Sequence, residues 1–174
     1  INEGVGATDP AALAQRVVLE AADLGIALDG DGDRLVMVDD AGNIVDGDEL
    51  LLVIALYRQA KGDLRGGVVG TLMSNLGLEV ALKHHNIDFV RSAVGDRHVL
   101  ADLIQRDWAL GGEGSGHILC LDQTTTGDGV VSALQVLVAI VGSGKTLRHL
   151  VSVMDKYPQT MINVKDVSPG AMQA

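Results

Sequence analysis

The sequence predicts an α/β protein: a layered α/β/α domain with a mixed sheet, preceded by part of a second α/β domain. From about residue 47 to 156, short apolar runs typical of strands alternate with longer segments of helical periodicity. The first 46 residues hold one helix and a few strands, too little to bury an independent core. With 174 residues, 47% of them hydrophobic, the chain is long enough for one domain and a fraction.

The first 46 residues are predicted to form the end of a domain. Asp9 and Pro10 begin a helix that runs to about Ala22, because aspartate caps helices and proline is tolerated in their first turn. Three strands follow, at 24–28, 35–39 and 44–45. The unpaired edge of this incomplete sheet favours pairing with a second copy, so a homodimer is one expected assembly.

Residues 47–156 are predicted to form the complete domain, and residues 157–174 a linker. Asp48 is expected to cap a helix that ends at Lys61 and Gly62. Further helices are expected at 75–84, 99–106, about 128–141 and 147–154, with Asp96 as the cap of the second of these. Strands are expected at 67–72, 87–94, 108–111, 118–121 and 160–164.

The run 29–34, between two predicted strands, reads Asp-Gly-Asp-Gly-Asp-Arg. Alternation brings the carboxylates to one side, and the glycines let the backbone fold tightly. Neighbouring carboxylates repel one another unless a cation neutralises them, and oxygen ligands suit Mg²⁺ or Ca²⁺. A solvated acidic turn is the alternative, whereas an EF-hand would require glycine where Arg34 stands. We therefore predict a metal site at Asp29, Asp31 and Asp33.

A second glycine-rich run, 111–117, reads Gly-Gly-Glu-Gly-Ser-Gly-His. Its glycines allow the backbone to approach a ligand closely. Glu113, Ser115 and His117 alternate, so one face could present a carboxylate, a hydroxyl and an imidazole. The Glu-Ser pair suits neighbouring sugar hydroxyls, and histidine suits proton transfer near neutral pH. A flexible hairpin loop whose polar residues face water is the alternative interpretation.

Composition argues against several classes of partner. The formal net charge of −10 disfavours a nucleic-acid-binding surface. No apolar run reaches the roughly 18–20 residues of a membrane span, and no signal peptide opens the chain. The single cysteine, Cys120, lies in an apolar run and is expected to be a buried structural thiol. A reducing cytoplasm fits this pattern, so we expect a cytoplasmic protein without nucleic-acid or membrane partners.

Three weaker patterns also have plainer interpretations. Thr126 or Asp128 either caps the following helix or helps to hold an anion at its N-terminus. Arg97 is a solvated charge, contacts a phosphate or makes a structural contact. The run 141–146 looks like the end of a P-loop, but the first glycine of that motif would fall at Ala139. We therefore do not predict nucleotide binding there.

The two glycine-rich loops together resemble those of the α-D-phosphohexomutases. That family carries a D-G-D-G-D-R metal loop and, in the next domain, a G-E-x-S-G-H sugar loop, which here fall at 29–34 and 112–117. The segments at 1–4, 6–9, 70–75, 94–97 and 122–129 look like the phosphoglucosamine mutase branch. Gly114 and His98 depart from that branch, in which Asn or Gln and an aromatic residue are expected.

The resemblance implies a parent enzyme that interconverts glucosamine 6-phosphate and glucosamine 1-phosphate. Phosphate would pass from an enzyme phosphoserine to the sugar, giving a bisphosphate intermediate. Mg²⁺ would be the cofactor, held by the three aspartates of the acidic loop. The implied substrate-binding residues are Glu113, Ser115 and His117, and the implied catalytic residues are Arg34 and His117.

Family members have four domains, and this sequence matches only the middle of that arrangement. The serine loop of the first domain and the arginine-rich loop of the fourth are not found in it. We therefore expect the end of domain two at 1–46, domain three at 47–156, the remaining domains as partners, and no activity from this part alone. The alternatives are phosphomannomutase or phosphoglucomutase specificity, or a non-catalytic module that binds metal or sugar phosphate.

Overall fold

The N-terminal unit is a three-stranded antiparallel sheet with one helix on its outer face. A computed structural model describes residues 2–160 and residue 162. After a short turn, η1 (Gly6–Thr8), helix α1 (Ala11–Glu20) packs on strands β1 (Leu24–Leu28) and β2 (Leu35–Asp39). Strand β3 (Ile44–Val45) pairs with β2. Leu28 pairs with Leu35, so the acidic loop closes the end of the β1–β2 hairpin.

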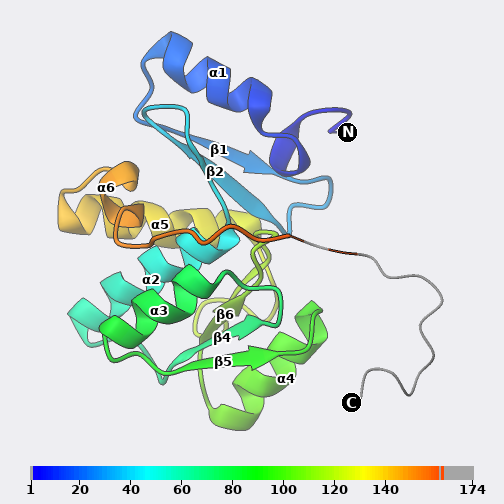
Figure 1. Ribbon diagram of the computed structural model, residues 1–174, viewed down its shortest axis with the longest axis vertical. Coiled ribbons are helices and arrows are strands. Elements are labelled where there is room, and N and C mark those ends of the chain that lie inside the picture. The colour runs from blue at the N-terminus through cyan, green and yellow to red at the C-terminus, as the bar shows by residue number, and fades with distance from the viewer. Residues whose placement is uncertain (1, 161, 163–174) are drawn as a thin grey trace.

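The C-terminal unit is a mixed sheet between two layers of helices, as predicted (Figure 1). The strands are β4 (Val68–Thr71), β5 (Phe89–Ser92), β6 (Leu110–Gly112) and β7 (Ile118–Cys120), in the order β5-β4-β6-β7. Strand β4 runs parallel to β5 and β6, and β6 runs antiparallel to β7. One side of the sheet is covered by three helices, α2 (Gly47–Lys61), α3 (Leu76–His84) and α5 (Gly129–Ser143). The other side is covered by α4 (Asp96–Arg106). Helix α6 (Leu147–Val151) packs beside α2.

One hydrophobic core joins the two units. Leu35 and Met37 of β2 are fully buried in the same cluster as the apolar face of α2 and the inward residue Val68 of β4. A smaller cluster on the other side of the sheet contains Val69 and the α4 residues Val99 and Leu103. Because β2 and α2 share a core, the acidic loop at the start of β2 is held in a fixed position relative to the second unit.

Three predicted helix caps are wrong, because a neighbouring residue (Pro10, Asp46 or Gly95) occupies each cap position. Asp9 ends the η1 turn, and α1 begins two residues later without a side-chain cap. Asp46, not Asp48, caps α2: its carboxylate accepts from the Glu49 amide while the Glu49 carboxylate accepts from the Asp46 amide. Gly95 occupies the cap position of α4, which makes Asp96 the first helical residue.

The other elements match their predicted positions, with ends that differ by a few residues. Helix α2 ends at Gly62, as expected, and Gly62 has a left-handed conformation. Asn75, predicted as the first residue of a helix, is the cap of α3. The strand predicted at 160–164 lies largely outside the described residues. Within residues 2–160, no helix combines the length and the apolar character that crossing a bilayer requires.

We predict that Gly47→Ala destabilises the chain although alanine is the better helix former. A β-carbon at residue 47 would overlap the carbonyl oxygen of Glu113 and crowd the amide of Gly116. The clash should lower the free energy of unfolding by about 1–3 kcal/mol, measured by urea denaturation. Gly30→Ala is the matched control, because a β-carbon there meets no atom within 4 Å. Equal stability of the two variants would contradict the predicted contact.

Candidate functional site

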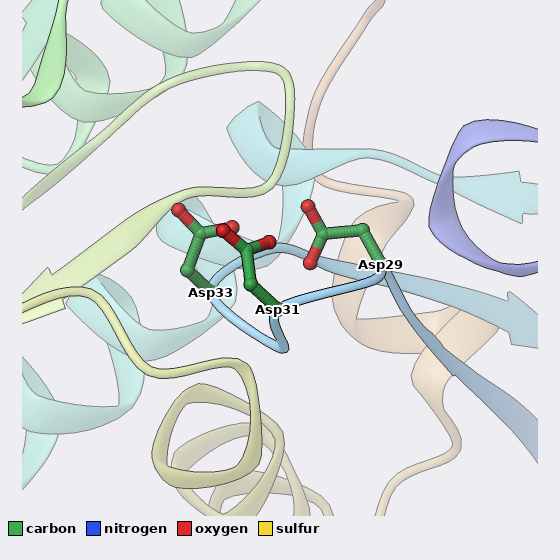
Figure 2. Close-up of side chains that lie close together, drawn as sticks. All are labelled: Asp29, Asp31 and Asp33. Carbon is green, nitrogen blue, oxygen red and sulfur yellow. The ribbon is translucent and has the colours of Figure 1, made fainter. Parts of the chain in front are cut away.

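The acidic loop brings its three carboxylates together. One oxygen from each of Asp29, Asp31 and Asp33 lies within 4.8 Å of the other two, and no other such group occurs in the described part of the chain. Figure 2 shows the three side chains converging on one side of the loop. Gly32 has a φ of 76°, a left-handed conformation that lets the backbone fold back between the last two aspartates.

The charges of this loop are only partly balanced by the protein. Burial raises the pKa of Asp29, but the Arg34 amide, which donates to Asp29 Oδ1 at 3.2 Å, and the Arg34 charge outweigh burial, so the net shift is downward. Burial and the neighbouring Asp29 raise the pKa of Asp33. The Arg34 guanidinium is half-exposed and stands 3.7 Å from Asp29 and 4.0 Å from Asp33. Arg34 therefore offsets the repulsion without removing it.

The donor set fits a hard divalent cation. Asp33 Oδ1 is buried and has no hydrogen-bond partner among the described residues, so it keeps free lone pairs. Carboxylate oxygens are the ligands that Mg²⁺ and Ca²⁺ prefer, and Mg²⁺ is commonly bound by one or two carboxylates together with water and phosphate. The three convergent oxygens could supply such ligands.

The second predicted loop is the tight turn between β6 and β7. The Gly116 amide donates to the Glu113 carbonyl at 2.9 Å, and the Glu113 amide donates to the His117 carbonyl at 3.0 Å. Glu113 Oε1 accepts from the Gly95 amide at 2.9 Å, and Ser115 Oγ donates to Glu113 Oε2 at 3.2 Å. The structure therefore brings Glu113 and Ser115 together, with the carboxylate anchored to the start of α4.

His117 lies apart from that pair and contacts the acidic loop. Its Nδ1 is 3.0 Å from Asp33 Oδ2, and its side chain is largely buried. Its ring rests on the backbone of Gly127, where a β-carbon would overlap it. Next to it, the Leu35 amide donates to the Gly116 carbonyl at 3.0 Å. His117 thus joins the two glycine-rich loops and does not share one face with Glu113 and Ser115.

Glu113 and Ser115 border a cavity of about 370 Å³. The N-terminus of α2, the end of β4 and the segment after α6 complete its walls. Its other lining residues are Asp46, Asp48, Thr71, Met73, Val94, Gly114 and Gln159. A second cavity, of about 340 Å³, lies between α2 and α6 among mostly apolar side chains such as Val53 and Leu150, away from both loops. The polar cavity is therefore the one associated with the predicted site.

Asp48 is the residue of this cavity that sequence reasoning missed. It is only 3% exposed, and its Oδ2 accepts from the Asn75 amide at 2.7 Å. Its Oδ1 has no hydrogen-bond partner among the described residues. Burial raises the pKa of Asp48 to about 6, against the hydrogen bond from Asn75, which lowers it. The Asp-x-x-Glu pattern of a capping box at 46–49 was the available signal, since it assigns the cap to Asp46 and leaves Asp48 unexplained.

Two of the weaker sequence patterns, at Asp128 and at 141–146, are ordinary structural features. Asp128 caps α5, accepting from the amides of Val130 and Val131 at 2.8 and 3.0 Å. The helix start also contacts the acidic loop, because the Gly129 amide donates to the Gly32 carbonyl at 2.9 Å. Cys120 is buried, and burial raises the pKa of its thiol to about 11, as expected for a structural residue. The run 141–146 contains the end of α5, its cap Gly144 and Thr146, the cap of α6.

Comparison with known families gives a consistent result. Residues 46–157 match the family described as phosphoglucomutase/phosphomannomutase, alpha/beta/alpha domain III. The phosphoglucosamine mutase of Methylococcus capsulatus is 64% identical over 165 residues, which are 95% of this chain and 37% of that protein. The chain therefore spans little more than a third of the length of this curated relative.

Solved structures show the same fold. A putative phosphomannomutase from Thermus thermophilus superposes with a TM-score of 0.74 at 25% identity, over 81% of this chain and 32% of that one. The N-acetylphosphoglucosamine mutase of Aspergillus fumigatus, solved with GlcNAc-6P and magnesium, superposes with a TM-score of 0.63 at 19% identity, over 76% of this chain and 33% of that one.

We predict that Asp48→Asn stabilises the chain at neutral pH and not at acidic pH. Burial raises the pKa of Asp48 from 3.8 to about 6, so the folded chain binds the proton more tightly than the unfolded chain does. The native chain is therefore more stable when Asp48 is protonated, and it loses this stability as the pH rises through 6. The stability advantage of the Asp48→Asn variant over the native chain should grow by about 2–3 kcal/mol between pH 4 and pH 7.5. Urea denaturation across this range measures it.

The control for this titration is Asp63→Asn, which removes an exposed carboxylate near the far end of α2. It removes the same charge as Asp48→Asn at an exposed position, and so controls for the change in net charge. A difference between Asp48→Asn and the native chain that stays flat from pH 4 to pH 7.5 would show that Asp48 ionises in the folded chain as it does in water.

Proposed function

The chain belongs to the phosphoglucomutase/phosphomannomutase family, and we propose that it supplies the metal loop and the sugar loop of a phosphoglucosamine mutase. The observation that carries the proposal is the contact between the loops: His117 of one reaches Asp33 of the other at 3.0 Å. This contact would fix the metal ligands of one loop relative to the sugar-orienting residues of the other. The 64% identity to a phosphoglucosamine mutase favours an aminohexose phosphate over other hexose phosphates.

Each loop has a distinct proposed role. Asp29, Asp31 and Asp33 would hold Mg²⁺, and the magnesium in the Aspergillus fumigatus relative supports this choice of ion. When bound, Mg²⁺ neutralises charge on a phosphoryl group and orients it. Arg34 adds a positive charge at the same edge, which assists an incoming phosphate.

The sugar would be oriented by the pair Glu113 and Ser115. The carboxylate is fixed by the Gly95 amide, so it can accept from sugar hydroxyls without first becoming ordered. Ser115 adds a hydroxyl that both donates and accepts. His117 engages Asp33 through Nδ1, which leaves Nε2, beside the backbone of Gly127, as its other atom for proton exchange.

We infer that residues 1–46 are the end of the second domain of the enzyme and residues 47–156 its third. The family match at 46–157 supports this division. The phosphoserine donor and the main phosphate-binding residues would then lie in the remaining domains, which are the partners of this part. The two loops described here can hold metal and sugar, but neither contains a phosphoryl donor.

Removal of one metal ligand tests the metal assignment. We predict that Asp31→Asn raises the Kd for Mg²⁺ at least about tenfold, because one of three convergent carboxylates loses its charge. Asp31 is exposed, so the fold should be retained. Isothermal titration calorimetry on the chain measures the affinity.

Glu113→Ala is the counterpart in this test. It should weaken binding of glucosamine 6-phosphate and leave the Kd for Mg²⁺ within about twofold, since Glu113 does not belong to the metal cluster. A large loss of Mg²⁺ affinity in Glu113→Ala, or an unchanged one in Asp31→Asn, would show that the two loops have been assigned the wrong roles.

We also predict that the 174-residue chain does not interconvert the two glucosamine phosphates. Metal and sugar loops alone provide no donor, and positioning by the missing domains contributes several powers of ten in rate. The assay supplies glucosamine 6-phosphate, Mg²⁺ and a bisphosphate activator and follows glucosamine 1-phosphate. Turnover above a control without protein, in a preparation free of host mutase, would refute the proposed division of labour.

A further inference from the structure

The cavity between α2 and α6, called the apolar cavity below, is separate from the proposed metal and sugar sites. Its volume is about 340 Å³, which is within the range of small-molecule sites. Its walls are the part of α2 from Val53 onward, the end of α5, helix α6 and the residue that follows α3. Helices α2, α5 and α6 lie side by side at this place (Figure 1). Since α2 begins against the sugar loop, the apolar cavity lies toward the opposite end of that helix.

The inner walls of the apolar cavity are hydrophobic and reach the main core. Val53 is only 2% exposed and belongs to the core cluster, against which the partly buried Leu56 and Leu150 pack. All three line the cavity, and the half-exposed Val153 lines it as well. A ligand with an apolar body would cover these side chains and remove its own surface from water, which is the main source of affinity at such sites.

The titratable groups that line the apolar cavity are basic, apart from one tyrosine. They are Lys145, His85, His149 and Tyr57, and no aspartate or glutamate is found among the described lining residues. The chain as a whole has a formal net charge of −10, so this local composition runs against its average. Lys145 takes part in none of the ion pairs among the described residues. A second cation stands close by, because Lys61 Nζ is 5.5 Å from the centre of the Tyr57 ring.

Charge and apolar surface together define the class of ligand. An inorganic anion would pair with Lys145 but leave the hydrophobic walls uncovered. A neutral hydrocarbon would cover the walls without using the charge, and an amine would be repelled by it. A sugar phosphate would place its hydroxyls against side chains that offer no hydrogen bonds, at a cost in desolvation. A carboxylate attached to a short hydrocarbon body satisfies both parts of the cavity.

We propose that the apolar cavity is a second ligand site, which binds a small carboxylate with a hydrocarbon body. Lys145 pairs with the carboxylate at the rim, and the hydrocarbon lies along Val53, Leu56 and Leu150. His149 of α6 also lines the cavity and is a further hydrogen-bond donor for the carboxylate. The apolar cavity shares no lining residue with the cavity beside the sugar loop, so the two ligands do not exclude each other. This site goes beyond the proposed function and does not depend on it.

The test titrates octanoate into the 174-residue chain at about pH 7 and follows amide chemical shifts. Butanoate, 1-octanol and octylammonium are the comparison ligands. We expect octanoate to bind at least about thirtyfold more tightly than butanoate, which buries four fewer methylene groups. It should bind at least about threefold more tightly than 1-octanol, which lacks the charge, and octylammonium should bind more weakly than 1-octanol. The shifts should centre on Tyr57 and Leu150 and spare Gly114 and Ser115.

Charge reversal at the rim provides a second arm of the test. Lys145→Glu should raise the Kd for octanoate at least about fivefold and leave that for 1-octanol within about twofold. It should also reverse the order of octanoate and octylammonium. Lys83→Glu is the matched control, because it changes net charge equally at an exposed position of α3 that does not line the apolar cavity. This control should keep the native order of the ligands.

Several results would overturn the inference. They are equal affinities for octanoate and 1-octanol, an unchanged ligand order in Lys145→Glu, and shifts confined to the sugar loop. A dimer whose formation abolishes octanoate binding would show instead that this face is an interface between copies of the chain. The comparison of ligands needs no variant, so the inference is tested even if Lys145→Glu does not fold. None of these results bears on the metal and sugar loops, which Asp31→Asn and Glu113→Ala test separately.

Discussion

The close approach of two glycine-rich backbones is the constraint on which the site depends. The sugar loop lies against the start of α2, where the Gly47 amide donates to the Gly114 carbonyl at 3.1 Å, and against β2, where the Leu35 amide donates to the Gly116 carbonyl. Side chains at residues 47 or 116 would separate these segments, because a β-carbon at either position overlaps backbone atoms. Glycine is therefore required for packing here, and not only for turning the chain.

This contact allows elements from two sheets to form one site. The metal loop belongs to the N-terminal hairpin and the sugar loop to the β6–β7 turn. The shared core of β2 and α2 fixes their positions relative to each other. His117 and the start of α5 add polar contacts across the same junction, to Asp33 and to the Gly32 carbonyl. A ligand that touches both loops thus meets a surface that is already assembled, which lowers the entropic cost of binding.

Sequence alone predicts the fold class and both loops, because strand periodicity, glycine spacing and alternating carboxylates are local patterns. Contacts between residues that are far apart in the sequence cannot be predicted from such local patterns. The contact of His117 with Asp33 joins residues 84 positions apart, and the contact of Asp48 with Asn75 joins residues 27 apart. Local pattern places Asp48 at a helix cap because aspartate is favoured there. Only packing shows that Asp46 takes that position and that Asp48 turns inward.

Two acidic sites a short chain distance apart need not compete for the same cation, because their geometries differ. The metal loop concentrates three oxygens at one point, which matches the short ligand distances of a divalent ion. The cavity distributes its carboxylates around a volume of about 370 Å³, enough for a sugar ring and its substituents. A phosphate of the substrate would be drawn toward Mg²⁺ held by Asp29, Asp31 and Asp33 and toward Arg34, while Glu113 and Ser115 would orient the sugar.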